Sequence, residues 1–193
     1  MDIIEIKKKT DFRHLNLFSV NYRDRIGNAK SWVFASRLND PLLVVKQEAA
    51  AMADAVVLVP WHREKDRLVL IREFRVPLGG YQYGFPAGLV DERETIEQAG
   101  RRELKEETGL DVARVLKQSP PVFSSSGMTD ESVALLYVEC TGEPSLEWNE
   151  ASEEIEVVFF SRRDAEALLQ TPGIKFDVKS WIVLSSFADH GVV

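Results

Sequence analysis

The sequence is poor in cysteine, in histidine and in positive charge, and each shortage excludes a class of protein. Cys140 is the single cysteine among 193 residues, so no internal disulfide can form and a reducing, cytoplasmic compartment is expected. The three histidines, His14, His62 and His190, are widely separated, which argues against a histidine metal cluster. The 24 Lys and Arg against 31 Asp and Glu give a net charge of −7, which argues against a protein that binds nucleic acid by neutralising phosphates.

Long apolar runs are also missing. No stretch approaches the ~20 apolar residues that span a bilayer, and the first twelve residues place lysines after a short apolar piece, unlike a signal peptide. We therefore expect a cytoplasmic protein without a membrane partner. Apolar residues at 45% and charged residues at 28% are typical of a globular chain of one domain, or one domain with a small appendage.

The first 48 residues have the alternating pattern of antiparallel strands. Apolar and polar residues alternate over 15–24 and again over 29–38, with a turn region at 24–27 between them. The pattern predicts a small β-meander (1–48) ahead of a main domain (49–193).

The main domain begins with strands and then changes period. The apolar run 55–61 predicts a strand buried on both faces, and 67–74 predicts another strand. The following segment, 77–88, is rich in Pro and Gly and is expected to be loop. Thr95 and Gln98 form a capping-box pattern for a helix that ends at Gly109.

Alternating strand and helix patterns complete the chain. Strands are predicted at 112–116, 132–140 and 155–160, a helix capped by Ser161 after them, and a last helix at 177–189. This order indicates an α+β fold with a mixed sheet between helices rather than a doubly wound fold.

Three carboxylates crowd one side of the first predicted helix. Offsets of three and four residues place Glu103, Glu106 and Glu107 within an arc of about 100°. Like charges at this spacing repel, but hard divalent cations such as Mg²⁺ bind through carboxylate oxygens. The alternative, from these glutamates alone, is a solvated acidic helix face.

The residues around these glutamates decide between the two readings. The segment 88–110 carries a fixed pattern of nine positions: Gly88, Glu94, Arg102, Glu103, Leu104, Glu106, Glu107, Gly109 and Leu110. In this it resembles the Nudix hydrolases. The resemblance implies a Nudix-type α/β/α sandwich and hydrolysis of a nucleoside diphosphate linked to another group.

The resemblance also implies roles for single residues. Glu103, Glu107 and the carbonyl of Ala87 would bind Mg²⁺ or Mn²⁺, with Glu106 bound to the metal directly or through water. Arg102 would point to Glu94 and hold the carboxylates in place. The general base would lie on a loop before a late strand. Its candidates are Glu150, Glu153 and Glu154, of which Glu153 is preferred because it immediately precedes that strand; a solvated acidic loop is the alternative.

The flanking segments, 71–75 and 85–92, are similar to the ADP-ribose and nucleotide-sugar pyrophosphatase branch. The branch implies a homodimer in which the N-terminal meander exchanges between chains. It also implies that Arg75 contacts a phosphate or the terminal ribose, against the alternative of an exposed arginine at the end of a strand. Arg72 is a second candidate for substrate binding and could instead form a salt bridge. Trp32 could stack on the nucleobase of the substrate; the alternative is that this aromatic residue lies in the core.

One position departs from the branch. A proline usually stands sixteen residues after the signature, and this chain has Ser126 there, followed by Gly127. This departure leaves room for another nucleotide sugar. From the signature and its flanks, the expected activity is metal-dependent cleavage of an ADP-ribose-like nucleoside diphosphate sugar into a nucleoside monophosphate and a sugar phosphate. The alternatives are GDP-mannose, NADH or dinucleoside polyphosphates as substrates, or a non-catalytic module that binds nucleotide sugars.

Overall fold

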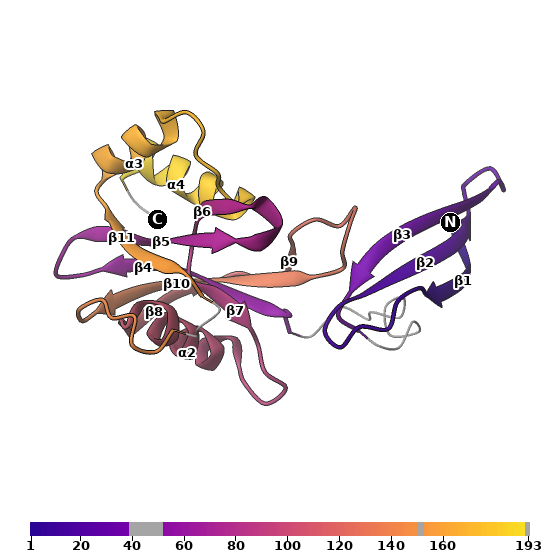
Figure 1. Ribbon diagram of the computed structural model, residues 1–193, viewed down its shortest axis with the longest axis horizontal. Helices are drawn as coiled ribbons and strands as arrows, with labels where there is room; N and C mark the ends of the chain where they lie inside the picture. Colours follow the sequence, from indigo (N-terminus) through magenta and orange to yellow (C-terminus); the bar gives the residue numbers. More distant parts are fainter. Residues whose placement is uncertain (39–51, 150–152, 192–193) are drawn as a thin grey trace. The chain divides into compact units, whose positions relative to one another are not determined.

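A computed structural model describes residues 1–38, 52–149 and 153–191 (Figure 1). The chain divides into two compact units. The first unit combines Met1–Asp54 with Pro121–Val133, and the second combines Ala55–Pro120 with Ala134–Val193. The boundary expected after residue 48 falls outside the described residues, and the inclusion of Pro121–Val133 in the first unit was not foreseen.

The N-terminal meander of the first unit is a three-stranded antiparallel sheet. Its strands β1 (Asp2–Lys8), β2 (Asn16–Arg23) and β3 (Ala29–Ser36) lie in sequence order. The two predicted strands and their turn are confirmed, whereas β1 was not predicted. In the turn, Asp24 Oδ1 accepts hydrogen bonds from the backbone N–H groups of Ile26 and Asn28, at 3.0 and 2.8 Å.

The second unit is built on a sheet with the strand order β11-β5-β4-β10-β8. These strands are β11 (Ile155–Phe160), β5 (Arg67–Arg75), β4 (Ala55–His62), β10 (Ser132–Thr141) and β8 (Asp111–Gln118). Asp54 N donates to Ser132 O and Arg63 N donates to Cys140 O, so β4 and β10 run parallel. The β4–β5, β5–β11 and β8–β10 pairs are antiparallel, which confirms the mixed sheet and the α+β class.

The Pro- and Gly-rich segment after β5 is not the loop that its composition predicts. It forms a 3₁₀ turn, η1 (Val76–Leu78), and two short strands, β6 (Gly80–Gly84) and β7 (Ala87–Leu89). Strand β6 pairs with β5, and β7 pairs with β4. The short β9 (Val122–Phe123) likewise pairs with the start of β10. Pairing with strands already in place overrides the weak local propensity of such segments.

Helices cover both faces of the sheet of the second unit (Figure 1). Helix α2 (Ile96–Thr108) lies on one face, and α3 (Arg162–Gln170) and α4 (Val178–His190) on the other. The predicted capping box is present, since the Thr95 side chain accepts from Gln98 N and the Gln98 side chain accepts from Thr95 N. Among the described residues, no helix is long and apolar enough to cross a membrane.

Candidate functional site

Helix α2 packs closely against the sheet, and this packing sets the distance between its carboxylates and the strands. Leu104 is fully buried, and a Cβ added to Gly100 would lie 2.6 Å from Leu136 Cδ2 on β10. Helix α2 also lies close to β7, because a Cβ added to Gly88 on that strand would lie 1.9 Å from Glu103 Oε1. A glycine at position 88 is therefore what lets the Glu103 carboxylate lie against β7.

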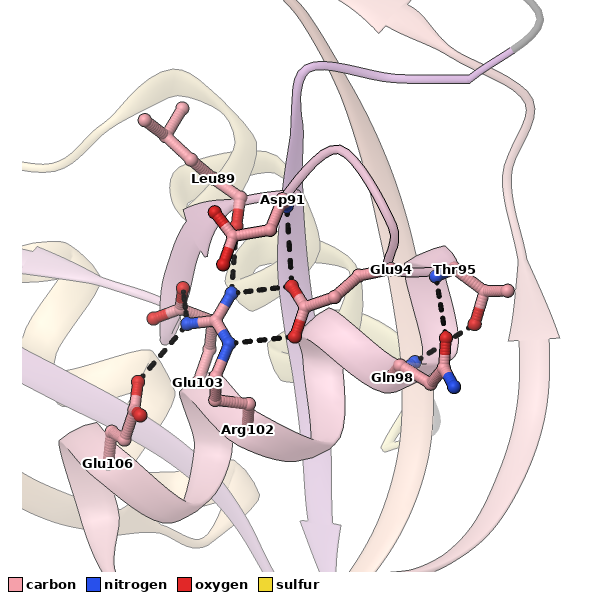
Figure 2. Close-up of polar contacts among 8 residues, drawn as sticks. All are labelled: Leu89, Asp91, Glu94, Thr95, Gln98, Arg102, Glu103 and Glu106. Atoms are coloured by element: carbon pink, nitrogen blue, oxygen red, sulfur yellow. Dashed lines mark hydrogen bonds and ion pairs between the residues drawn. The ribbon is translucent and has the colours of Figure 1, made fainter.

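The Arg102 guanidinium holds three glutamates together (Figure 2). Its Nε and Nη2 donate to the two oxygens of Glu94 at 2.9 and 2.8 Å, a bidentate pair. Its Nη1 donates to Glu103 Oε1 at 2.6 Å and to Glu106 Oε2 at 3.1 Å, and Nη2 also donates to Leu89 O at 3.0 Å. The predicted contact between Arg102 and Glu94 is present. Glu94 thereby orients the guanidinium group that also contacts Glu103 and Glu106.

Glu107 is the most deeply placed carboxylate of the site. Its residue is 6% exposed, and its Oε2 accepts a hydrogen bond from Ala87 N at 3.1 Å. Burial, and then the charge of Glu103, raise the pKa of Glu107 well above its ordinary value. Burial also raises the pKa of Glu103, although the hydrogen bond from Arg102 opposes this. The fold thus keeps two adjacent carboxylates where their negative charge is disfavoured.

Two further glutamates add negative charge on this side of the sheet. The charge of Glu153 raises the pKa of both Glu103 and Glu107, and the charge of Glu73 raises that of Glu107. Of the two candidates for the general base that the structure describes, Glu153 is the one whose charge is coupled to the carboxylates of α2. Glu154 instead accepts a hydrogen bond from the Tyr81 hydroxyl, and Glu150 lies outside the described residues.

The two arginines predicted to bind substrate, Arg72 and Arg75, lie on opposite faces of β5. Arg75 pairs with Glu73 through Nη1 at 2.7 Å, on the face that carries Glu73. Arg72 has the opposite parity along the strand, stacks 3.8 Å from the Tyr81 ring centroid and pairs with Glu156 at 3.2 Å. The structure therefore brings Arg75, but not Arg72, to the side of the acidic residues.

Trp32 lies on β3 in the first unit and is not a core residue. Its side chain is 51% exposed, and its Nε1 donates to Gly127 O at 3.2 Å. The contact joins the meander to the loop that contains Ser126, within the same unit. An indole whose edge is held while the residue stays half-exposed is suited to stacking.

The chemistry of the α2 carboxylates fits a hard divalent cation. They supply oxygen donors only, and burial without full charge compensation favours a bound cation. Within residues 1–38, 52–149 and 153–191, no group of three or more His, Cys, Asp or Glu side chains is arranged to hold a metal ion. Glu103 and Glu106 point to Arg102, and Glu107 points to Ala87 N. The ligand roles of these residues and of the Ala87 carbonyl stay predictions.

Sequence reasoning missed two residues of this region, Glu73 and Tyr81. Both become noticeable only when the strand register is known: Glu73 lies opposite Ile155, and Tyr81 lies opposite Phe74. The alternation of β5 was the available signal for Glu73, since it shares a face with Arg75. Nothing in the Gly-rich segment pointed to Tyr81.

Comparisons with known proteins find a matching family model and several similar sequences. A family model described as the NUDIX domain matches residues 52–182. The chain is 33% identical over 146 residues, 72% of its length, to a Caenorhabditis elegans protein whose name places it among the nudix hydrolases, and it spans 62% of that protein. It is 29% identical to a Saccharomyces cerevisiae protein named ADP-ribose pyrophosphatase, covering 90% of this chain and 77% of the yeast protein.

A solved structure shares the fold. The crystal structure of an ADP compounds hydrolase superposes with a TM-score of 0.70 at 20% sequence identity, covering 98% of this chain and 94% of that one.

Proposed function

This chain belongs to the Nudix family, and from its site we propose that it hydrolyses the diphosphate bond of an ADP-ribose-like nucleoside diphosphate sugar. The products would be a nucleoside monophosphate and a sugar phosphate. The observation that carries the proposal is the pairing on α2 of the partly buried Glu103 with the buried Glu107, with the charge of Glu153 acting on both. The names of the yeast relative and of a mouse relative, ADP-sugar pyrophosphatase (30% identical over 127 residues), support this substrate class.

The proposal assigns a task to each group of residues. Glu103, Glu106, Glu107 and the Ala87 carbonyl would hold Mg²⁺ or Mn²⁺, and Arg102, oriented by Glu94, would keep the carboxylates at their spacing. A bound divalent cation supplies charge neutralisation of the diphosphate and a lowered pKa of a coordinated water.

The remaining residues act on the water and on the substrate. Glu153 would accept the proton of the attacking water, a role that needs a carboxylate within hydrogen-bond reach of that water. Arg75 can exchange its pair with Glu73 for a substrate phosphate or ribose, and Trp32 would stack on the base. Because Arg72 is stacked on Tyr81, we assign it a structural rather than a substrate-binding part.

The proposal includes a homodimer in a cytoplasmic, reducing compartment. Cys140 is buried and unpaired, as such a compartment allows, and the meander exposes Ile3, Ile4 and Val33, which a second copy of the chain could cover. Sedimentation of the purified protein as a monomer would contradict the dimer.

A hydrolysis screen tests the activity. The protein is assayed with Mg²⁺ and with Mn²⁺ on ADP-ribose, GDP-mannose, UDP-glucose, NADH and diadenosine polyphosphates, with product analysis. We expect ADP-ribose cleavage that falls about 10³-fold in Glu107→Gln, since a lost metal interaction costs several kcal/mol of transition-state stabilisation. Glu97→Gln is the matched control, because Glu97 lies on the same helix but forms only a solvent-exposed pair with Arg101.

The outcomes of the screen separate the alternatives. Preference for GDP-mannose, NADH or a dinucleoside polyphosphate would keep the metal site and replace the substrate. Tight binding of nucleotide sugars without turnover, in metal-replete protein, would instead indicate a binding module and contradict the proposed hydrolysis.

A further inference from the structure

Strand register places Glu153 and Glu154 on opposite faces of the sheet. In the pairing of β11 with β5, Ile155 lies opposite Glu73 and Glu156 opposite Arg72. The ladder continues beyond β11, because Phe74 N donates to Glu154 O at 3.0 Å. Side chains alternate along an extended chain. Glu154 therefore shares the face of Arg72 and Phe74, whereas Glu153 shares the face of Glu73.

The face of Glu154 carries a built cluster. The Tyr81 hydroxyl donates to the Glu154 carboxylate, and the Tyr81 ring packs edge-on against Phe74, with centroids 5.5 Å apart. The Arg72 guanidinium lies 3.8 Å from the centre of the Tyr81 ring, and its Nη1 pairs with Glu156 Oε2 at 3.2 Å. Glu154 is thus held by its backbone and by its side chain, from two neighbouring strands.

The opposite face carries the acidic residues of the site. Glu73, on that face, and Glu153 both act electrostatically on the buried Glu107. Because side chains alternate along the extended chain, a contact that holds Glu154 on one face also restrains the neighbouring Glu153 to the opposite face. Tyr81 is the only one of the described residues shown to donate a side-chain hydrogen bond to Glu154.

We propose that Tyr81 is a positioning residue for the general base: by holding Glu154 on the far face, it keeps Glu153 directed at the α2 carboxylates. The proposal rests on the proposed function for the part that Glu153 plays in hydrolysis. Arg72 assists by stacking on the ring, which gives this arginine a use that needs no contact with substrate. Misplacement of a reacting group by about 1 Å can cost up to 10²-fold in rate, so the effect is measurable.

Kinetics of conservative variants tests the proposal. Tyr81→Phe keeps the ring under Arg72 and removes only the hydroxyl, and we expect kcat to fall roughly 10-fold with KM unchanged. Glu154→Ala should fall equally, and the double variant no further, because both changes break one contact. Glu154→Gln keeps an oxygen that accepts from Tyr81 and should retain the wild-type kcat. Tyr83→Phe is the control, since it removes a hydroxyl two residues along β6 at a side chain that packs on Phe160 and Phe176.

A second measurement does not depend on activity. Hydrogen exchange of the Phe74 amide reports the bond to Glu154 O, and we expect it to quicken roughly 5-fold in Tyr81→Phe but not in Tyr83→Phe. If exchange of the Phe74 amide is unchanged in Tyr81→Phe, the Tyr81 hydrogen bond does not hold Glu154. If kcat is unchanged in active enzyme, Tyr81 does not position the general base. If wild-type protein cleaves no nucleotide, the proposed function fails, and the exchange result alone then decides whether Tyr81 holds Glu154.

Discussion

The two units bury apolar side chains to different degrees. In the second unit, the central strands β4 and β5 are almost wholly enclosed; Val56, Leu58, Val59, Leu68, Val69 and Leu70 are fully buried. In the described part of the first unit, Phe18 is the only large apolar side chain that is fully buried. Its sheet leaves Ile4, Trp32 and Val33 at 56%, 51% and 57% exposed.

If the proposed function holds, the difference in burial separates the unit that carries the chemistry from the unit that recognises the substrate. A sheet of three strands with little core needs further cover for independent stability, which a partner chain or a bound substrate can provide. The helix carboxylates need the reverse, a rigid support that holds disfavoured charges in place. The acidic site lies on the second unit, which has its own core. Trp32, the exposed side chain proposed to stack on the nucleobase, lies on the first unit, which has little core.

Two glycine substitutions give the largest expected contrast between the units. A Cβ in Gly88→Ala would overlap Glu103 Oε1, the end of a flexible side chain, so the carboxylate must turn away. We expect activity to fall about 10²-fold while the melting temperature changes little. In Gly127→Ala, on the first unit, the new Cβ meets nothing within 4 Å, and both quantities should stay near wild type. Equal losses in the two variants would remove the contrast.

Trp32 gives a smaller effect of a different kind. Stacking of a base on an aromatic side chain contributes about 1–3 kcal/mol, so Trp32→Ala should raise KM roughly 10-fold and leave kcat unchanged. Trp32→Phe keeps a ring but loses the bond to Gly127 O, which separates stacking from loop attachment. Steady-state kinetics on the preferred nucleotide makes the measurement. A fall in kcat at constant KM would show that the first unit takes part in the chemical step.

Local signals made the helix side of the site predictable. The capping box of Thr95 and Gln98 and the C-terminal Gly109, at φ 74°, depend on neighbours in sequence, and the α2 boundaries follow from them. The carboxylate spacing and the contact of Arg102 with Glu94 follow from the family pattern within the same 23 residues.

The strand side was less predictable, because its residues meet only through long-range pairing. Strands β6 and β7 exist because β5 and β4 accept them, although their Gly and Pro content indicates loop. The hydrogen bond from Tyr81 to Glu154 joins residues 73 positions apart. No local periodicity carries such a contact, and the face on which Glu153 lies follows only from the register of β11.

The smallest expected effect is on stability. The pKa of Glu107 lies above its ordinary value of 4.5 in the folded protein, mainly through burial. In metal-free protein, the wild type should therefore lose stability relative to Glu107→Gln as pH rises from about 4.5 through the raised pKa. The difference should vanish at acid pH, where the carboxyl is protonated in both folded and unfolded chains. Urea unfolding in EDTA over a pH series measures it.

Asp130 provides the counterpart of Glu107 in the first unit. Burial also raises its pKa, but a hydrogen bond from Ser36 Oγ at 2.9 Å opposes the shift. Asp130→Asn should therefore show the same sign as Glu107→Gln and a smaller change. Added Mg²⁺ or Mn²⁺ should then stabilise the wild type and Asp130→Asn but not Glu107→Gln, by about 2.7 kcal/mol at a hundredfold excess over Kd. Equal stabilisation of all three proteins would mean that the cation binds away from α2, and that the buried charge of Glu107 has no counter-ion there.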